Sequence, residues 1–197
     1  MKKVIELFNK SPVVSHNSVA RIVGTNSSYT KQLIRNLIIE NKIKRLTKGY
    51  YTIHDDPSLT VFCFKPAYLG LQDALSIHDL WEQETIPIVI TTRKIRQGIR
   101  NINNNNIMLR RINKKYMFGI EYKSINNYYF PYSDIEKTFI DMIYYKQHID
   151  KETLKEFKKR INKKKLKSYL KKYPELMRMR AEKELKKEWI YLYIVNI

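Results

Sequence analysis

The sequence has one cysteine and five glycines among 197 residues, and it lacks a long apolar run. Cys63 alone cannot form an internal disulfide, which favours a reducing cytoplasm, and its apolar neighbours predict a core thiol. No stretch approaches the ~20 apolar residues of a membrane-spanning helix, and the N-terminus lacks the apolar run of a signal peptide. We therefore expect a soluble, cytoplasmic protein without membrane contact.

Residue patterns typical of catalysis or metal binding are also scarce. The chain has no H-x-x-x-H pair, no cysteine partner for a histidine and no glycine-rich phosphate loop. The histidines are scattered, at His16, His54, His78 and His148. We predict no cofactor, no metal ion and no enzymatic activity.

A metal-dependent nuclease, or another nucleic-acid-processing protein, is the alternative. Glu121-Tyr122-Lys123, on a predicted strand, has the E-x-K form that can hold a metal ion and a water. Such a site normally needs another carboxylate on the preceding strand, and no Asp or Glu occurs from Thr85 to Ile120. A surface ion pair between Glu121 and Lys123 is the simpler interpretation.

The excess of basic residues lies at the two ends of the chain. The net charge is +19, and residues 1–53 carry 10 basic and 2 acidic residues. Residues 54–150 carry 12 basic and 11 acidic residues, whereas residues 151–188 carry 16 basic and 6 acidic residues. Basic segments around a nearly neutral centre indicate surfaces that face a polyanion, with nucleic acid the first candidate and an anionic membrane surface second. An interaction module with an acidic protein partner is a third hypothesis.

Residues 1–55 follow the order of a winged helix-turn-helix. Gly24 ends the second helix, and the Thr47-Lys48-Gly49 turn joins two alternating strands. The predicted elements are helices at 2–9 and 27–41, strands at 43–46 and 50–53, and a second helix that carries Val19, Ala20, Ile22 and Val23. Either Ser15 or Asn17 can cap this second helix. This order predicts that the third helix enters the major groove of double-stranded DNA.

The predicted third helix has an apolar stripe and a polar face. The stripe comprises Tyr29, Leu33, Ile34, Leu37 and Ile38. Arginine and glutamine can contact bases through two hydrogen bonds, so we expect Lys31, Gln32 and Arg35 to read the sequence. The hairpin would hold phosphates through Lys44, Arg45 and Lys48. The predicted DNA-binding residues are Ser27, Ser28, Tyr29, Lys31, Gln32, Arg35, Lys42, Lys44, Arg45, Lys48 and Tyr50.

Residues 58–148 predict an α+β domain with a mostly antiparallel sheet. The predicted elements are strands at 59–64, 86–91, 107–112, 116–122 and 128–130, a helix at 67–81, a polar loop at 103–106 and a helix capped by Ser133. We expect the acidic residues of this domain to cap helices or to pair with arginines. The acids are Asp73, Asp79, Glu136 and Asp141, and the arginines are Arg93, Arg96, Arg110 and Arg111. The basic run 91–96 could face nucleic acid or a partner, or orient a turn.

Residues 149–197 predict a basic helical extension. Asp150 should cap one helix, whose apolar face is Leu154, Phe157 and Ile161, and Pro174 fits the first turn of the last helix. The lysine run 163–165 is either a solvated helix face or a contact for phosphate or an acidic protein. The uncharged, β-prone segment Trp189–Ile197 should pair with a sheet or another subunit.

Several segments together resemble the AbiEi antitoxins of type IV toxin-antitoxin (abortive infection) systems. They are IENKIKRLTKGYYTI at the predicted wing, AYLGLQDALSIHDLWEQ followed by IPIVITTRKIRQG, and YSDIEKTFIDMI. The resemblance spans roughly residues 1–185. His78-Asp79-Leu80 replaces the family's His-Gly-Leu, Asn41-Lys42-Ile43 replaces a glycine, and the lysine-rich end is longer.

The resemblance implies a repressor that acts on its own operon through the winged domain. It also implies an operator with inverted repeats and a partner toxin of the nucleotidyltransferase class. In a type IV system the antitoxin need not bind the toxin directly.

Overall fold

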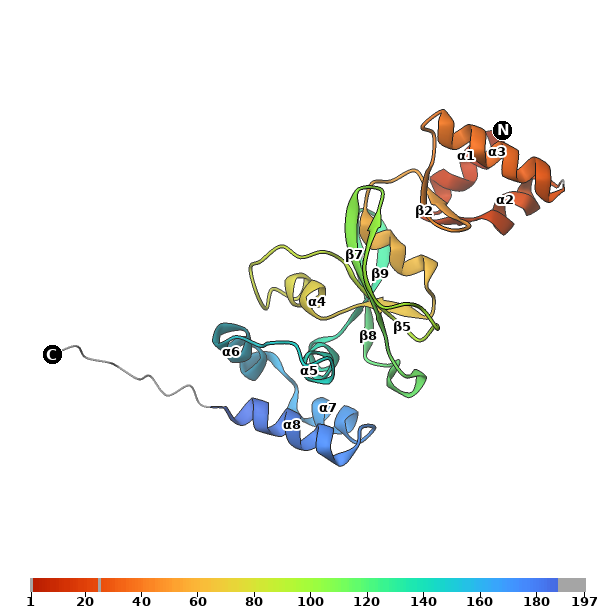
Figure 1. Cartoon of the computed structure of the whole chain (residues 1–197). Helices are drawn as coiled ribbons and strands as arrows, with labels where there is room; N and C mark the ends of the chain where they lie inside the picture. The colour runs from red at the N-terminus through yellow and green to blue at the C-terminus, as the bar shows by residue number, and fades with distance from the viewer. Residues whose placement is uncertain (1, 25, 188–197) are drawn as a thin grey trace.

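The computed structural model describes residues 2–24 and 26–187, which form three parts in chain order (Figure 1). A helical N-terminal part with a small sheet precedes a six-stranded sheet, and helices follow. The class is α+β, and the sheets are mostly antiparallel, as predicted. Trp189–Ile197 lies outside the described residues, so its predicted pairing stays a prediction.

The N-terminal part contains three helices and a three-stranded antiparallel sheet in the order β1-β3-β2. Ser15 caps α2 by accepting the Ser18 amide at 3.1 Å, and Gly24, at φ 68°, ends it. The elements are α1 (Lys2–Lys10), β1 (Val14–Ser15), α2 (His16–Val23), α3 (Ser27–Ile39), β2 (Lys44–Thr47) and β3 (Tyr50–Thr52). Their shared core includes Phe8, Val19 and Leu37.

The central sheet has the strand order β6-β7-β5-β4-β9-β8. The pairs β5–β7 and β4–β9 are parallel, and the other three pairs are antiparallel. The strands are β4 (Ala67–Leu69), β5 (Ile88–Thr91), β6 (Gly98–Ile102), β7 (Asn105–Arg111), β8 (Ile120–Ile125) and β9 (Tyr128–Ser133). A short helix, α4 (Gln72–Ile77), follows β4.

The two faces of the central sheet have separate cores, because side chains alternate between faces along a strand. Tyr68 and Ile90 belong to a core shared with the C-terminal helices. Leu69 and Val89 belong to a second core, shared with the 3₁₀ helix η1 (Pro57–Cys63). Cys63 is buried in this second core, as predicted.

Two predictions between residues 59 and 81 are wrong. The predicted strand 59–64 is the 3₁₀ helix η1, because Asp56 accepts the Ser58 amide at 2.8 Å and Pro57 starts a helical turn. The predicted helix 67–81 begins as strand β4, and only Gln72–Ile77 is α-helical. Strand β4 is buried on both faces, and such a strand lacks the alternation that distinguishes it from a helix.

Two further strand predictions need correction. Residues 116–122 begin in a 3₁₀ turn, η2 (Lys114–Tyr116), which Asn113 caps, and β8 starts only after Gly119 at φ 66°. In the predicted loop 103–106, only Asn103 and Asn104 form the tight turn of the β6–β7 hairpin. Asn105 and Asn106 begin β7, and strand β6 was not predicted. Asn103 and Asn104 occupy its left-handed positions, which asparagine tolerates.

The C-terminal helices are α5 (Ile135–Tyr144), α6 (Lys151–Arg160), α7 (Lys163–Leu170) and α8 (Glu175–Lys186). Asp134 rather than Ser133 caps α5, because it accepts the Lys137 amide at 2.8 Å. Asp150 caps α6, and Leu154 and Phe157 are buried, as predicted. No helix in the ranges 2–24 and 26–187 is long and apolar enough to cross a lipid bilayer.

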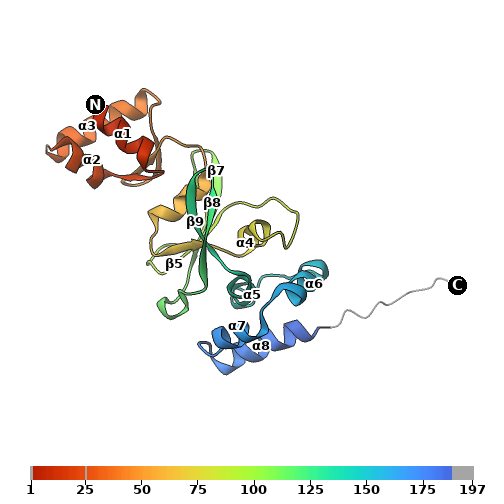
Figure 2. The same cartoon turned by 180° about the vertical axis from the view of Figure 1, so that it is seen from behind.

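The N-terminal part and the C-terminal helices lie at opposite ends of the central sheet (Figure 2). Leu46 of β2 is 4% exposed and packs in the core of the sheet with Leu59 and Val61, not in the N-terminal core. Val13 and Tyr50 pack against the same core. The β2–β3 hairpin is therefore held against the sheet.

Candidate nucleic-acid interface

Helix α3 is anchored by its cap and by an apolar stripe. Asn26 accepts the Tyr29 amide at 2.9 Å, which satisfies one of the free amides of the first turn. Thr30, Ile34 and Leu37 are buried against α1 and α2. This packing determines which side of α3 faces solvent.

The opposite face of α3 is exposed along its length. The predicted base-reading residues Lys31, Gln32 and Arg35 are all exposed. Gln32 donates to the Asn36 side chain at 3.0 Å. The exposed members of the predicted set on this helix are Ser27, Ser28, Tyr29, Lys31, Gln32 and Arg35.

Tyr29 does not belong to the apolar stripe. Its side chain is 55% exposed, and Thr30 takes the buried position. The Thr30 hydroxyl donates to the Asn26 carbonyl at 3.2 Å, so a polar side chain is accommodated there. Tyr29 instead lies at the exposed start of α3, next to Ser28.

The cations of the hairpin differ in their partners. Lys44 forms an ion pair with Asp55, and Lys42 lies 2.7 Å from Glu40. Among the described residues, Arg45 and Lys48 have no acidic partner, and both are exposed. Tyr50 is half-buried and packs against the core of the central sheet. The hairpin thus presents Arg45 and Lys48 as uncompensated positive charges.

The fold brings three of the predicted cations together between α3 and the hairpin. They surround a shallow hollow of about 330 Å³ with an apolar floor. It is lined by Lys31, Ile34, Arg35, Ile38, Ile39, Arg45 and Tyr51. Lys31, Arg35 and Arg45 therefore form one positive surface across two elements.

A buried ion pair in α5 was not predicted. Lys137 and Asp141, one turn apart, are fully buried and paired. The Tyr68 hydroxyl donates to Asp141 at 2.6 Å, and Lys137 donates to Tyr173 at 3.2 Å. Burial raises the pKa of Asp141 and lowers the pKa of Lys137, and their attraction opposes both shifts. The i, i+4 spacing of a lysine and an aspartate in an apolar helix is the sequence feature from which this ion pair could have been predicted.

The acidic residues of the middle part do not pair with the predicted arginines. Glu136 pairs with Lys165 at 2.8 Å, and Asp73 accepts the Ile88 amide at 3.2 Å. In the described chain, none of the four acids forms an ion pair with the four arginines. Asp73 and Asp141 accept from tyrosine hydroxyls, and Glu136 and Asp141 pair with lysines. Arg93, for example, donates to the Cys63 carbonyl at 3.0 Å.

Glu121 of the E-x-K sequence takes part in an ion pair. Its carboxylate lies 2.7 Å from Lys123 Nζ and 3.8 Å from His78 Nδ1. No group of three His, Cys, Asp or Glu residues suited to a metal ion occurs within residues 2–24 and 26–187. The simpler interpretation, a surface ion pair, is the one the geometry fits.

No model of a protein family matches the chain, and no curated protein matches it either. The chain is similar in structure to the RV2827C protein from Mycobacterium tuberculosis, with a TM-score of 0.60 and 12% sequence identity. The similarity covers 93% of this chain and 75% of that chain. At this identity, the similarity shows a shared fold alone.

Proposed function

We propose that residues 2–53 form a winged helix-turn-helix and that the protein is a DNA-binding transcriptional regulator. In this proposal α3 is the recognition helix and the β2–β3 hairpin is the wing. The observation that supports it is the division of α3, which buries Ile34 and Leu37 and exposes Lys31 and Arg35. A duplex could approach this face, because no other part of the described chain covers it.

The proposal assigns different roles to α3 and to the wing. Arg35 can contact guanine through two hydrogen bonds, and Gln32 can do the same with adenine. Arg45 and Lys48 would contact phosphates, which adds affinity without reading bases. Lys44 would contribute less, because Asp55 already neutralises it.

Fluorescence anisotropy with two labelled duplexes tests this function. One duplex carries the promoter region of the protein's own gene, and the other is a shuffled sequence of equal length. Arg35→Ala should weaken promoter binding by about 1–3 kcal/mol and leave the shuffled duplex nearly unchanged. Lys48→Ala should weaken both and reduce the salt slope by about 0.9. If the wild-type chain bound neither duplex at low salt, the proposed function would be overturned.

We further propose that the protein is an AbiEi-like type IV antitoxin in the cytoplasm. It would repress its own operon at inverted repeats and counter a nucleotidyltransferase-type toxin. The order of the wing, the 67–98 segment and the YSDIEKTFIDMI helix supports this assignment. A nucleotidyltransferase encoded beside the gene should inhibit growth when expressed alone, and co-expression of this protein should restore growth. The Lys48→Ala variant should repress the operon less well but should still restore growth.

A further inference from the structure

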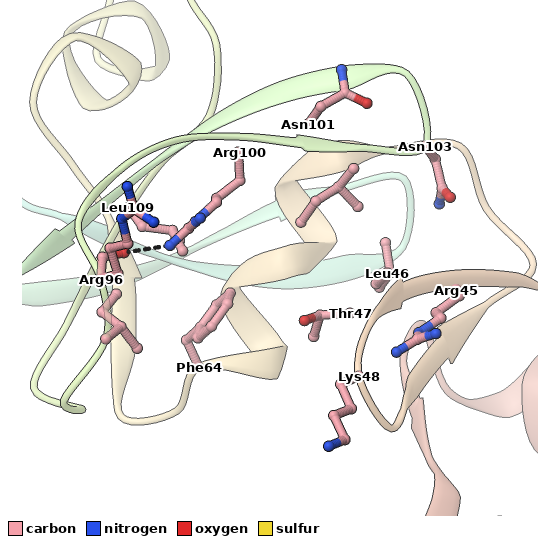
Figure 3. A pocket seen from close by; sticks show the side chains of 12 residues that line it. Arg45, Leu46, Thr47, Lys48, Phe64, Arg96, Arg100, Asn101, Asn103 and Leu109 are labelled. Carbon is pink, nitrogen blue, oxygen red and sulfur yellow. Dashed lines mark hydrogen bonds between the residues drawn. The ribbon is translucent and has the colours of Figure 1, made fainter.

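A cleft separates the β2–β3 hairpin from the β6–β7 hairpin of the central sheet (Figure 3). Its volume is about 590 Å³. Arg45 and Lys48 lie on one wall, and Arg96 and Arg100 come from the other (Figure 3). The remaining lining residues are Leu46, Thr47, Phe64, Ile95, Asn101, Ile102, Asn103 and Leu109.

The cleft is positively charged and contains no acidic residue. Within the described residues, none of its four cations forms an ion pair, and Arg100 donates a hydrogen bond to the Arg96 carbonyl at 3.1 Å. The wall formed by the central sheet belongs to the segment from Thr85 to Ile120, which has no Asp or Glu. Four uncompensated cations that line one cleft repel each other, so an anion bound among them would be favoured.

Core packing fixes the position of the two cleft walls relative to each other. Leu46, between Arg45 and Thr47 in the hairpin, is buried in the core that also contains Leu109 of the opposite wall. The hairpin cannot turn away from the sheet without exposing Leu46. The width of the cleft is therefore set by core packing, which lowers the entropic cost of binding across it.

We propose that this cleft binds the sugar-phosphate backbone of the duplex that α3 contacts, beyond the major groove that α3 enters. This inference rests on the proposed DNA-binding function and adds a second, sequence-independent contact from the central sheet. Guanidinium groups form paired hydrogen bonds with phosphate oxygens, and the side-chain amide of Asn103 can donate to the same backbone. The ligand of the cleft is thus the phosphodiester backbone of the DNA duplex.

The test is a salt titration of duplex binding with the full chain and the Arg96→Ala/Arg100→Ala double variant. Losing two phosphate contacts should reduce the slope of log K against log salt by about 1.8. Affinity should fall by the same factor for the promoter duplex and the shuffled duplex. Hydroxyl-radical footprinting should show renewed cleavage at one flank of the protected region only.

The matched control is Arg178→Ala/Arg180→Ala, which removes two exposed arginines from α8 at the far end of the molecule. It should leave the slope and footprint unchanged. Arg96→Lys/Arg100→Lys should keep most of the slope and confirm that the charge matters. An unchanged slope and footprint in the double Ala variant would overturn the cleft proposal alone, whereas no duplex binding by the wild-type chain would overturn the proposed function first.

Discussion

At the residue scale, Asp73 couples stability to pH. Burial raises the pKa of its carboxyl to about 7, although the Ile88 amide and the Tyr132 hydroxyl donate to it. A carboxyl whose pKa is higher in the folded than in the unfolded chain keeps its proton in the folded state. Its contribution to the free energy of unfolding is therefore full at low pH and declines as pH rises from about 4 to about 7.

Asp73→Asn should remove this decline. The gap between variant and wild type in the free energy of unfolding should grow by roughly 2–4 kcal/mol between pH 4.5 and pH 8, in favour of the variant. The lower value of this range applies if solvent screens the partly exposed carboxyl of Asp73. Urea denaturation at both pH values measures it, with Asp79→Asn as the exposed control. A gap that does not change with pH would contradict the assignment.

Asp55 should limit DNA affinity through its ion pair with Lys44. Asp55→Ala removes a negative charge beside the wing and frees Lys44 to contact phosphate. We expect promoter and shuffled duplexes to bind roughly two- to five-fold more tightly at low salt, with a steeper salt slope. Anisotropy titrations at several salt concentrations measure both quantities. Glu84→Ala, an exposed acid elsewhere, is the control, and an equal gain there would assign the effect to net charge.

At the scale of the element, the cap of α3 supports its exposed first turn. Asn26→Ala removes the hydrogen bond to the Tyr29 amide and should lower the free energy of unfolding by about 1 kcal/mol. The turn that frays carries Ser27, Ser28 and Tyr29, so DNA affinity should also fall. Thermal unfolding and anisotropy measure the two effects. Asn36→Ala, on the same helix but outside the cap, should change stability by less than about 0.5 kcal/mol.

At the scale of the whole molecule, Leu46 joins the wing to the central sheet. Leu46→Ala should lower the free energy of unfolding by about 2–5 kcal/mol, because the cavity opens in a closely packed core. The variant should also lose part of the salt slope, since the cleft walls are no longer held together. Leu154→Ala, in the core that the central sheet shares with the C-terminal helices, is the matched control. It should destabilise the chain without altering the slope that the cleft supplies.

The local signals at the N-terminus predicted this part of the chain well. Ser15, Gly24 and the Lys48-Gly49 turn act through backbone groups within a few residues, so their effect is readable from neighbouring sequence. Tyr29 was placed wrongly on the apolar stripe, since Thr30 can be buried once its hydroxyl bonds within the helix. The exposure of Lys31 and Arg35 follows from the positions of Ile34 and Leu37 on the other face.

The central part was less predictable, because its strands depend on distant partners. Ala67–Leu69 is a strand because it pairs with β5 on one side and β9 on the other. The spacing of apolar residues within the segment does not reveal this pairing. Strand β6 was missed for the same reason. The partners of Asp73, Glu136 and Asp141 come from other elements or from the buried side of a helix, so the prediction that these acids cap helices or pair with arginines missed those partners.

The sequence by itself determined the ends of helices at Gly24 and Asp150, the Lys48-Gly49 turn, the basic ends and the acid-free stretch from Thr85 to Ile120. These features act over a few residues or over total charge, so they need no knowledge of the fold. Only the tertiary structure decided that Leu46 enters the core of the sheet and that Arg96 and Arg100 line one cleft with Arg45 and Lys48. Residues about 50 positions apart meet there because two hairpins pack on one apolar core, and no local pattern encodes that packing.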